Sequence, residues 1–178
     1  MGFTWYGGLL GGTAAALVVI RRHQLPGGVV AGAVAVPLTV AYAIGRLGCL
    51  LSGDGTYGRP TDLPWGMAFP NGVVPTDVPV HPTPLYEAAA AVLIVAVLAY
   101  LGRRWAPVQV FGAYLVLSGL ARLIVEFVRI NDPVLAGLTQ PQLWALGSIA
   151  VGGALVLGGR RLQPPGGQPQ DSVVPLTA

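Results

Sequence analysis

Five apolar stretches, each long enough to cross a lipid bilayer, constrain the fold of this chain more than any other feature of its sequence. An α-helix rises about 1.5 Å per residue, so a span of roughly 20 residues crosses a hydrocarbon core of about 30 Å. Apolar residues make up 53% of the chain and charged residues only 10%, which argues against a soluble domain built on one core. We therefore expect an all-α, polytopic transmembrane helix bundle with spans at residues 3–20, 28–51, 84–101, 108–127 and 140–158.

Small residues crowd the first, second and fifth of these spans, as in the runs 7–12 and 152–154. Inside a bilayer, small residues let helices approach closely, so that dispersion and weak hydrogen bonds hold them together. These runs therefore predict close helix contacts.

The charges are divided between the two sides of the predicted spans. Arginine pairs follow the first, third and fifth spans, and the intervening loops carry aspartates; the pairs are Arg21-Arg22, Arg103-Arg104 and Arg160-Arg161. Because basic residues stay on the cytoplasmic side of a membrane, the amino terminus and the loop 52–83 are expected outside. We expect residues 1–161 to form the transmembrane domain and the Pro/Gly-rich residues 162–178 a flexible cytoplasmic tail.

The basic excess does not indicate a nucleic-acid-binding protein, because it consists of arginine alone and occurs mostly in short pairs. The single cysteine, Cys49, excludes an internal disulfide and a cysteine-only zinc site. The first apolar run lacks a basic leader and a small-residue cleavage site, so we expect a membrane span there and no cleaved signal peptide.

Ionisable residues within or at the ends of the predicted spans are candidate site residues: Arg46, Glu87, Arg122 and Glu126. Each would cost several kcal/mol facing lipid, so each should face the bundle interior, a partner or a polar ligand. Arg122, Glu126 and Arg129 share one helix face, which favours an internal ion pair. Arg46 and Arg122 lie at similar depth, where both could reach a phospholipid phosphate. The two interpretations do not exclude each other.

The segment 81–87 opens the third span with two prolines and a carboxylate. Proline fits the first turn of a helix, and Glu87 there would meet the positive helix end. His81 is expected at the outer interface, where it either exchanges protons or makes structural hydrogen bonds.

Five blocks of the chain resemble, in order, the signature of the prolipoprotein diacylglyceryl transferase family. They are GRLG (45–48), GDGTYGR (53–59), PWGMAFP (64–70), HPTPLYE (81–87) and GLARLIVEFVR (119–129). The resemblance implies transfer of a diacylglyceryl group from phosphatidylglycerol to the lipobox cysteine thiol of a preprolipoprotein. A thioether forms and glycerol phosphate leaves. It also implies a multi-pass protein of the bacterial inner membrane, in contact with membrane lipids, and no metal or organic cofactor.

The resemblance also implies roles for particular residues. Arg46 matches the phosphatidylglycerol-binding arginine of the family, and Arg122 matches its second essential arginine. Expected catalytic residues are Arg46, Arg122, Tyr6, Glu126 and His81, and expected substrate-binding residues are Arg46, Arg122, Gly58, Tyr86 and Glu87.

Three positions depart from the family pattern. Tyr6 stands where the family has a histidine before Gly-Gly, Cys49 replaces an asparagine, and Ser118 replaces a tyrosine one turn before Arg122. A tyrosine is a poor base at neutral pH, although its hydroxyl still donates a hydrogen bond. The chain also has five predicted spans where typical members have seven. These departures leave open a non-catalytic or truncated paralogue that binds anionic phospholipid.

Overall fold

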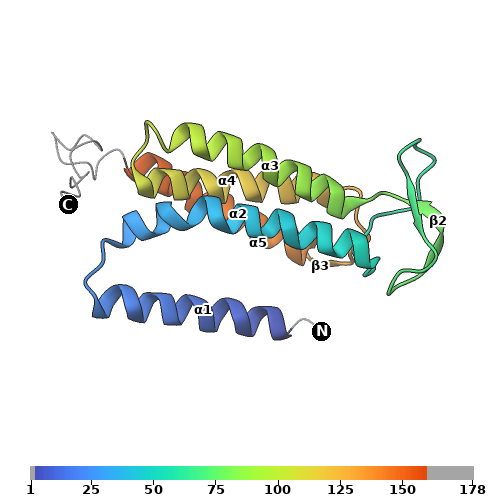
Figure 1. Cartoon of the computed structure of the whole chain (residues 1–178), viewed down its shortest axis with the longest axis horizontal. Coiled ribbons are helices and arrows are strands. Elements are labelled where there is room, and N and C mark those ends of the chain that lie inside the picture. The colour runs from blue at the N-terminus through green and yellow to red at the C-terminus, as the bar shows by residue number, and fades with distance from the viewer. Residues whose placement is uncertain (1–2, 160–178) are drawn as a thin grey trace, which may run out of the picture.

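The computed structural model describes residues 3–159, except for the side chains of residues 3–6 and 9 (Figure 1). This range contains five helices: α1 (Phe3–Arg22), α2 (Gly27–Ser52), α3 (Thr83–Leu101), α4 (Pro107–Glu126) and α5 (Gln140–Gly159). They coincide with the five predicted spans to within two residues at each end, so the all-α fold class is confirmed. The predicted tail 162–178 and the pair Arg160-Arg161 lie outside the described residues.

The helix ends follow from local sequence. Both α3 and α4 carry proline in the first turn, at Pro84 and Pro107, where its missing N–H is not needed. Helix α2 ends at Ser52 and is capped by Gly53, which has φ 59° and whose N–H donates to the carbonyl of Cys49 at 3.1 Å. Glycine adopts this left-handed conformation without the steric cost of a Cβ.

Four helices of the described range, α2 to α5, are long and apolar enough to cross a membrane. Their outward side chains are apolar and unburied: Leu93 is 69% exposed, Ile124 68% and Leu157 72%. Such an exterior suits hydrocarbon and would be costly in water. The chain is therefore a multi-pass membrane protein.

The bundle is held together by small residues and a small core. The core comprises Ala35 from α2, Ile94 and Leu98 from α3, and Val110 and Ala113 from α4. Helix α4 packs most extensively on α5, and α2 on α3.

Helices α4 and α5 approach each other at glycines. A Cβ built at Gly112 would lie 2.8 Å from the carbonyl oxygen of Gly152, and one built at Gly152 would lie 2.6 Å from that of Gly112. Buried Gln109 also joins the pair, because its Nε2 donates to the Val156 carbonyl at 3.0 Å. The close contact predicted for the small residues of the fifth span is therefore confirmed.

Helix α1 lies beside the bundle without extensive contact with it in the described part of the chain (Figure 1). A Cβ added at Gly7, Gly8, Gly11 or Gly12 would meet nothing within 4 Å. The prediction of close contacts for this glycine run is therefore wrong for the structure of residues 3–159, because no described helix covers that face.

Two short antiparallel hairpins were not expected from the sequence. Strands β1 (Met67–Phe69) and β2 (Thr76–Val80) lie inside the predicted loop 52–83, and β3 (Pro133–Leu135) and β4 (Leu138–Thr139) join α4 to α5. Both hairpins lie at one end of the bundle, and the α1–α2 and α3–α4 connections lie at the other (Figure 1). Within the described range, the loops that carry aspartate thus lie at one end of the bundle, and the arginine pairs lie at the other.

Candidate functional site

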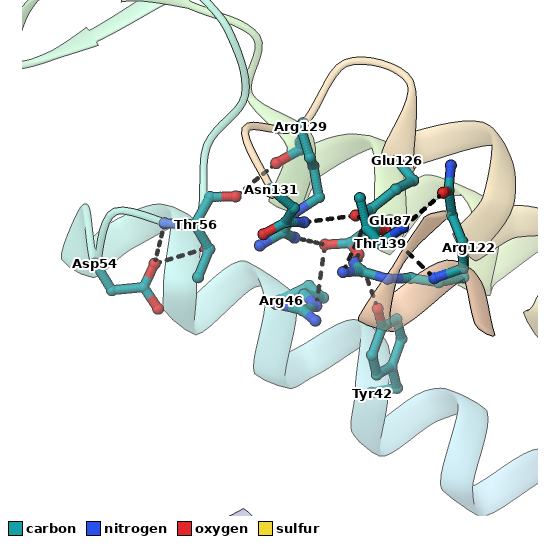
Figure 2. A network of polar contacts seen from close by, with 12 residues as sticks. Tyr42, Arg46, Asp54, Thr56, Glu87, Arg122, Glu126, Arg129, Asn131 and Thr139 are labelled. Atoms are coloured by element: carbon teal, nitrogen blue, oxygen red, sulfur yellow. Dashed lines mark hydrogen bonds and ion pairs between the residues drawn. The ribbon is translucent and has the colours of Figure 1, made fainter. Parts of the chain in front are cut away.

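Glu87 is the centre of a buried ion-pair network (Figure 2). It lies in α3, directly after the first helical turn, and is only 4% exposed. Its Oε1 lies 2.6 Å from Arg122 Nη1, and its Oε2 lies 3.1 Å from Arg46 Nε and 3.4 Å from Arg129 Nη1. The hydroxyl of Tyr42 donates to Oε1 at 3.1 Å. One carboxylate thereby joins α2, α3, α4 and the segment that follows α4.

Glu126, at the end of α4, extends this network to the β3–β4 hairpin. Its Oε2 lies 3.2 Å from Arg122 Nη2, in an ion pair without hydrogen-bond geometry. Its Oε1 accepts hydrogen bonds from Asn131 Nδ2 at 2.6 Å and from Thr139 Oγ1 at 2.7 Å. Since Asn131 precedes β3 and Thr139 ends β4, a single carboxylate oxygen fixes both ends of the hairpin (Figure 2).

The network carries one positive charge in excess, because three arginines face two glutamates. Burial lowers the pKa of Arg129, and repulsion from Arg122 lowers it further, as expected beside uncompensated positive charge. The side chains of Arg46 and Arg122 are 21% and 22% exposed, whereas that of Glu87 is 3% exposed. The predicted Arg–Glu pairing therefore exists, and it leaves guanidinium groups open to an anion.

Arg46 and Arg122 lie at the charged end of a cavity of about 500 Å³. Its other walls are mainly small, apolar or aromatic: Thr39, Tyr42, Glu87, Ala91, Ile94, Tyr114, Ser118, Gly119, Ala121, Gln140, Pro141, Trp144, Ala145 and Ser148. This volume is in the usual range for small-molecule sites. Charge at one end and apolar walls elsewhere suit an amphiphile with an anionic group.

Tyr42 is a site residue that the sequence analysis missed. Its ring lies beneath the Arg46 guanidinium, 4.9 Å from centroid to Cζ, and its hydroxyl bonds Glu87. Such a cation–π contact restrains the guanidinium without neutralising it. A signal was present, because Tyr42 lies one helical turn before Arg46 and residues four apart share a helix face.

His81 and Tyr86 pair with each other beside the network. His81 Nδ1 lies 3.2 Å from the Tyr86 hydroxyl, which also accepts a hydrogen bond from Trp65 Nε1 at 2.8 Å. Neither His81 nor Tyr86 lines the 500 Å³ cavity. Their contact with substrate stays a prediction.

Gly58 supports the network through the backbone. Its N–H donates to the His81 carbonyl at 2.9 Å, and a Cβ there would collide with the carbonyl oxygen of Val128. Gly58 also forms an isolated bridge with Arg129. Its missing side chain lets the loop lie against the segment that carries Arg129.

The three departures from the family pattern are placed differently. The side chain of Tyr6 lies outside the described residues. Ser118 lines the cavity and donates to the Tyr114 carbonyl at 2.6 Å. Cys49 lies near Asp54; burial raises the pKa of Asp54, but hydrogen bonds from Cys49 and Thr56 outweigh burial and hold it below its ordinary value.

Metal ligation has no support in the described side chains. Across that part of the chain, no group of three or more His, Cys, Asp and Glu residues is arranged to hold a metal ion.

A family model and several similar proteins all point to the same family. A sequence model of the prolipoprotein diacylglyceryl transferase family matches residues 1–158. Phosphatidylglycerol–prolipoprotein diacylglyceryl transferase of Nitrobacter winogradskyi is 37% identical over 168 residues, covering 87% of this chain and 55% of the relative. The protein of that name from Geobacter sulfurreducens is 39% identical over 142 residues, covering 79% and 53%. That from Rhodospirillum rubrum is 33% identical over 182 residues, covering 94% and 64%.

The matched region includes every block on which the sequence resemblance rests. The chain spans little more than half the length of the first two of these relatives. By the family match and by these identities, the chain belongs to the prolipoprotein diacylglyceryl transferase family.

Proposed function

We propose that this protein transfers the diacylglyceryl group of phosphatidylglycerol to the lipobox cysteine thiol of a preprolipoprotein, in the bacterial inner membrane. The observation that carries the proposal is the cavity of about 500 Å³, which has apolar walls and ends at Arg46 and Arg122. One excess positive charge matches the single negative charge of a phosphodiester. The names of the relatives supply the two substrates.

The reaction forms one carbon–sulfur bond and breaks one carbon–oxygen bond. The thiolate attacks the carbon of the diacylglyceryl group that is bonded to the phosphate oxygen. The electron pair of the broken bond stays on that oxygen, and glycerol phosphate leaves. Arg46 and Arg122 hold that phosphate and stabilise the charge that it gains, which is the largest contribution such a site offers. Glu87 keeps both guanidinium groups oriented through contacts of 3.1 and 2.6 Å.

The attacking thiol must lose its proton. A free cysteine is only a few per cent ionised at neutral pH, so a proton acceptor near the thiol accelerates the attack. We propose that Tyr6, His81 and Glu126 are the polar groups that help to remove this proton from the thiol. Gly58, Tyr86 and Glu87 would support substrate binding. Glu126 lies in direct contact with Arg122, one of the two arginines that we propose bind the phosphate.

Lipid binding without turnover is the second candidate function. It is favoured by the position of His81, whose ring pairs with Tyr86 and does not line the cavity. A protein of this kind would bind anionic phospholipid through Arg46 and Arg122 and leave an acceptor peptide unmodified.

The deciding experiment uses the purified full chain in nanodiscs that contain phosphatidylglycerol, together with a synthetic lipobox peptide. Mass spectrometry should detect the peptide with a diacylglyceryl thioether, and a peptide with serine in place of the cysteine should stay unmodified. Nanodiscs of phosphatidylcholine alone are the lipid control. Phosphatidylglycerol binding without thioether formation would select the second candidate.

A cellular test complements the chemical one. The chain is expressed in a bacterium depleted of its own diacylglyceryl transferase, and growth and lipoprotein gel mobility are followed. We expect rescue of both, with the protein recovered in the inner-membrane fraction. Correct membrane insertion without rescue would contradict the transferase proposal.

A further inference from the structure

A second cavity, of about 300 Å³, lies beside the β3–β4 hairpin and shares no lining residue with the first. Its polar lining comes from Arg59, Glu126, Arg129, Asn131, Thr139 and Gln142. These residues belong to three segments: the loop after α2, the end of α4 with its hairpin, and the start of α5. We call this cavity the hairpin pocket.

Two ion pairs link the hairpin pocket to the first cavity. Arg122 lines the first cavity and lies 3.2 Å from Glu126, which lines the hairpin pocket. Glu87 lines the first cavity and lies 3.4 Å from Arg129, which lines the hairpin pocket. The charged side chains of the two cavities are therefore in direct contact.

The hairpin pocket offers unused binding capacity. Among the described residues, no ion pair or hydrogen bond engages the guanidinium of Arg59, and Arg129 makes the longest of the three arginine contacts with Glu87. Glu126 contributes a carboxylate to the pocket wall, because its Oε1 accepts hydrogen bonds from Asn131 and Thr139, which line the same pocket. Two guanidiniums and a carboxylate acceptor suit a molecule that has both a phosphate and hydroxyl groups.

We infer that the hairpin pocket receives the glycerol phosphate that the transfer releases. The inference rests on the proposed function, and it assigns a binding site for the leaving group. The phosphodiester of the lipid carries one negative charge; breaking the carbon–oxygen bond leaves a phosphate monoester with a second charge until it is protonated. The departing group is thus drawn more strongly than the substrate toward Arg129 and Arg59.

The chemistry of the pocket distinguishes between two sources of phosphate. A lipid headgroup that stays attached to its acyl chains needs apolar walls nearby, and the first cavity supplies them. The hairpin pocket is lined mainly by charged, amide and hydroxyl side chains, with Phe127 and Pro133 as its larger apolar members. It therefore selects the water-soluble product.

Binding is measured directly, without turnover, on the full chain in phosphatidylcholine nanodiscs. Glycerol phosphate, inorganic phosphate and glycerol are titrated separately by calorimetry. We expect glycerol phosphate to bind more tightly than inorganic phosphate and glycerol not to bind. Arg59→Gln should weaken glycerol phosphate binding about tenfold, the usual effect of losing one charge-assisted contact.

The matched control is Arg104→Gln, at the opposite end of the bundle, which should leave binding unchanged. The Arg59 substitution spares the fold, because that residue holds its place through backbone bonds to Val128 at 2.8 Å and His81 at 3.0 Å. Equal affinity of Arg59→Gln and the unsubstituted protein would overturn the inference.

A turnover assay separates this inference from the proposed function. In an active protein, Arg59→Gln should raise the inhibition constant of glycerol phosphate and leave the KM for phosphatidylglycerol unchanged. A matching rise in that KM would mean that the pocket serves the lipid headgroup, and would overturn the inference. Arg59-dependent glycerol phosphate binding by a protein without transferase activity would support the pocket and count against the proposed function alone.

Discussion

Arg46 and Arg122 are the residues on which we expect anion binding to depend most directly. Both line the cavity and both keep about a fifth of their side chains exposed despite pairing with Glu87. We predict that Arg46→Ala or Arg122→Ala weakens phosphatidylglycerol binding or turnover about tenfold or more. Arg104→Ala, which removes an arginine from the other end of the bundle, should have little effect. Equal losses in all three variants, measured on nanodiscs of defined lipid, would mean that the intramembrane arginines are structural.

Glu87 sets the stability of the network. Glu87→Gln keeps the shape of the side chain and removes the charge that three arginines share. Because breaking a buried ion pair leaves uncompensated charge, the free energy of unfolding should fall by about 3 kcal/mol. Thermal unfolding in detergent measures this change, with exposed Asp77→Asn as the control. Equal unfolding temperatures of the two variants would show that the charge of Glu87 does not contribute to the stability of the protein.

The site was predictable where the sequence shows charge against an apolar background. Arg46, Glu87, Arg122 and Glu126 stand out in spans that otherwise lack acidic and basic residues, and all four join one network. Asn131 and Thr139 gave no such signal. Both lie in the connection between two predicted spans, where a polar residue is ordinary, and only the placement of the β3–β4 hairpin brings them to Glu126.

At the scale of elements, the crossing of α4 and α5 depends on the absence of side chains at two glycines. We predict that Gly112→Ala lowers the free energy of unfolding by about 2 kcal/mol, because the new Cβ would lie 2.8 Å from the Gly152 carbonyl oxygen and force the helices apart. Gly153→Ala is the matched control, since a Cβ there meets nothing within 4 Å. Alanine favours the helical state, so this variant should be as stable as the parent or slightly more stable. Similar destabilisation by both substitutions would contradict the close-contact explanation.

The β3–β4 turn explains why this hairpin was not predicted. Its two central residues, Ala136 and Gly137, have φ values of 51° and 76°. Hairpin turns with two positive φ values usually have Asn-Gly or Gly-Gly, and alanine hides that signal. The helices, in contrast, were predictable to within two residues because length and hydrophobicity alone determine a membrane span.

The strain at Ala136 is testable. We predict that Ala136→Gly stabilises the protein by about 1 kcal/mol, since glycine adopts a positive φ without a Cβ clash. Thermal unfolding should show a higher midpoint. A lower midpoint would mean that the entropy gained by the unfolded chain exceeds the strain removed.

At the scale of the whole molecule, the bundle has two chemically different ends. The pairs Arg21-Arg22 and Arg103-Arg104 lie at the connections opposite the two hairpins and the ion-pair network (Figure 1). The alternation of arginine and aspartate along the chain is therefore a real separation in space. The positive-inside rule predicts that the end with the arginine pairs faces the cytoplasm.

We predict this orientation to be measurable with single cysteines. In a Cys49→Ser background, a membrane-impermeant maleimide should label Asp77→Cys in intact spheroplasts and Arg103→Cys only after permeabilisation. Residue 77 lies in β2, at the hairpin end of the bundle, and residue 103 follows α3 at the opposite end (Figure 1). The reverse pattern would put the two cavities at the cytoplasmic side, where a phosphate released from the hairpin pocket would enter the cell. Because residue 103 and the site lie at opposite ends of the bundle formed by α2 to α5, the two labels must change sides together.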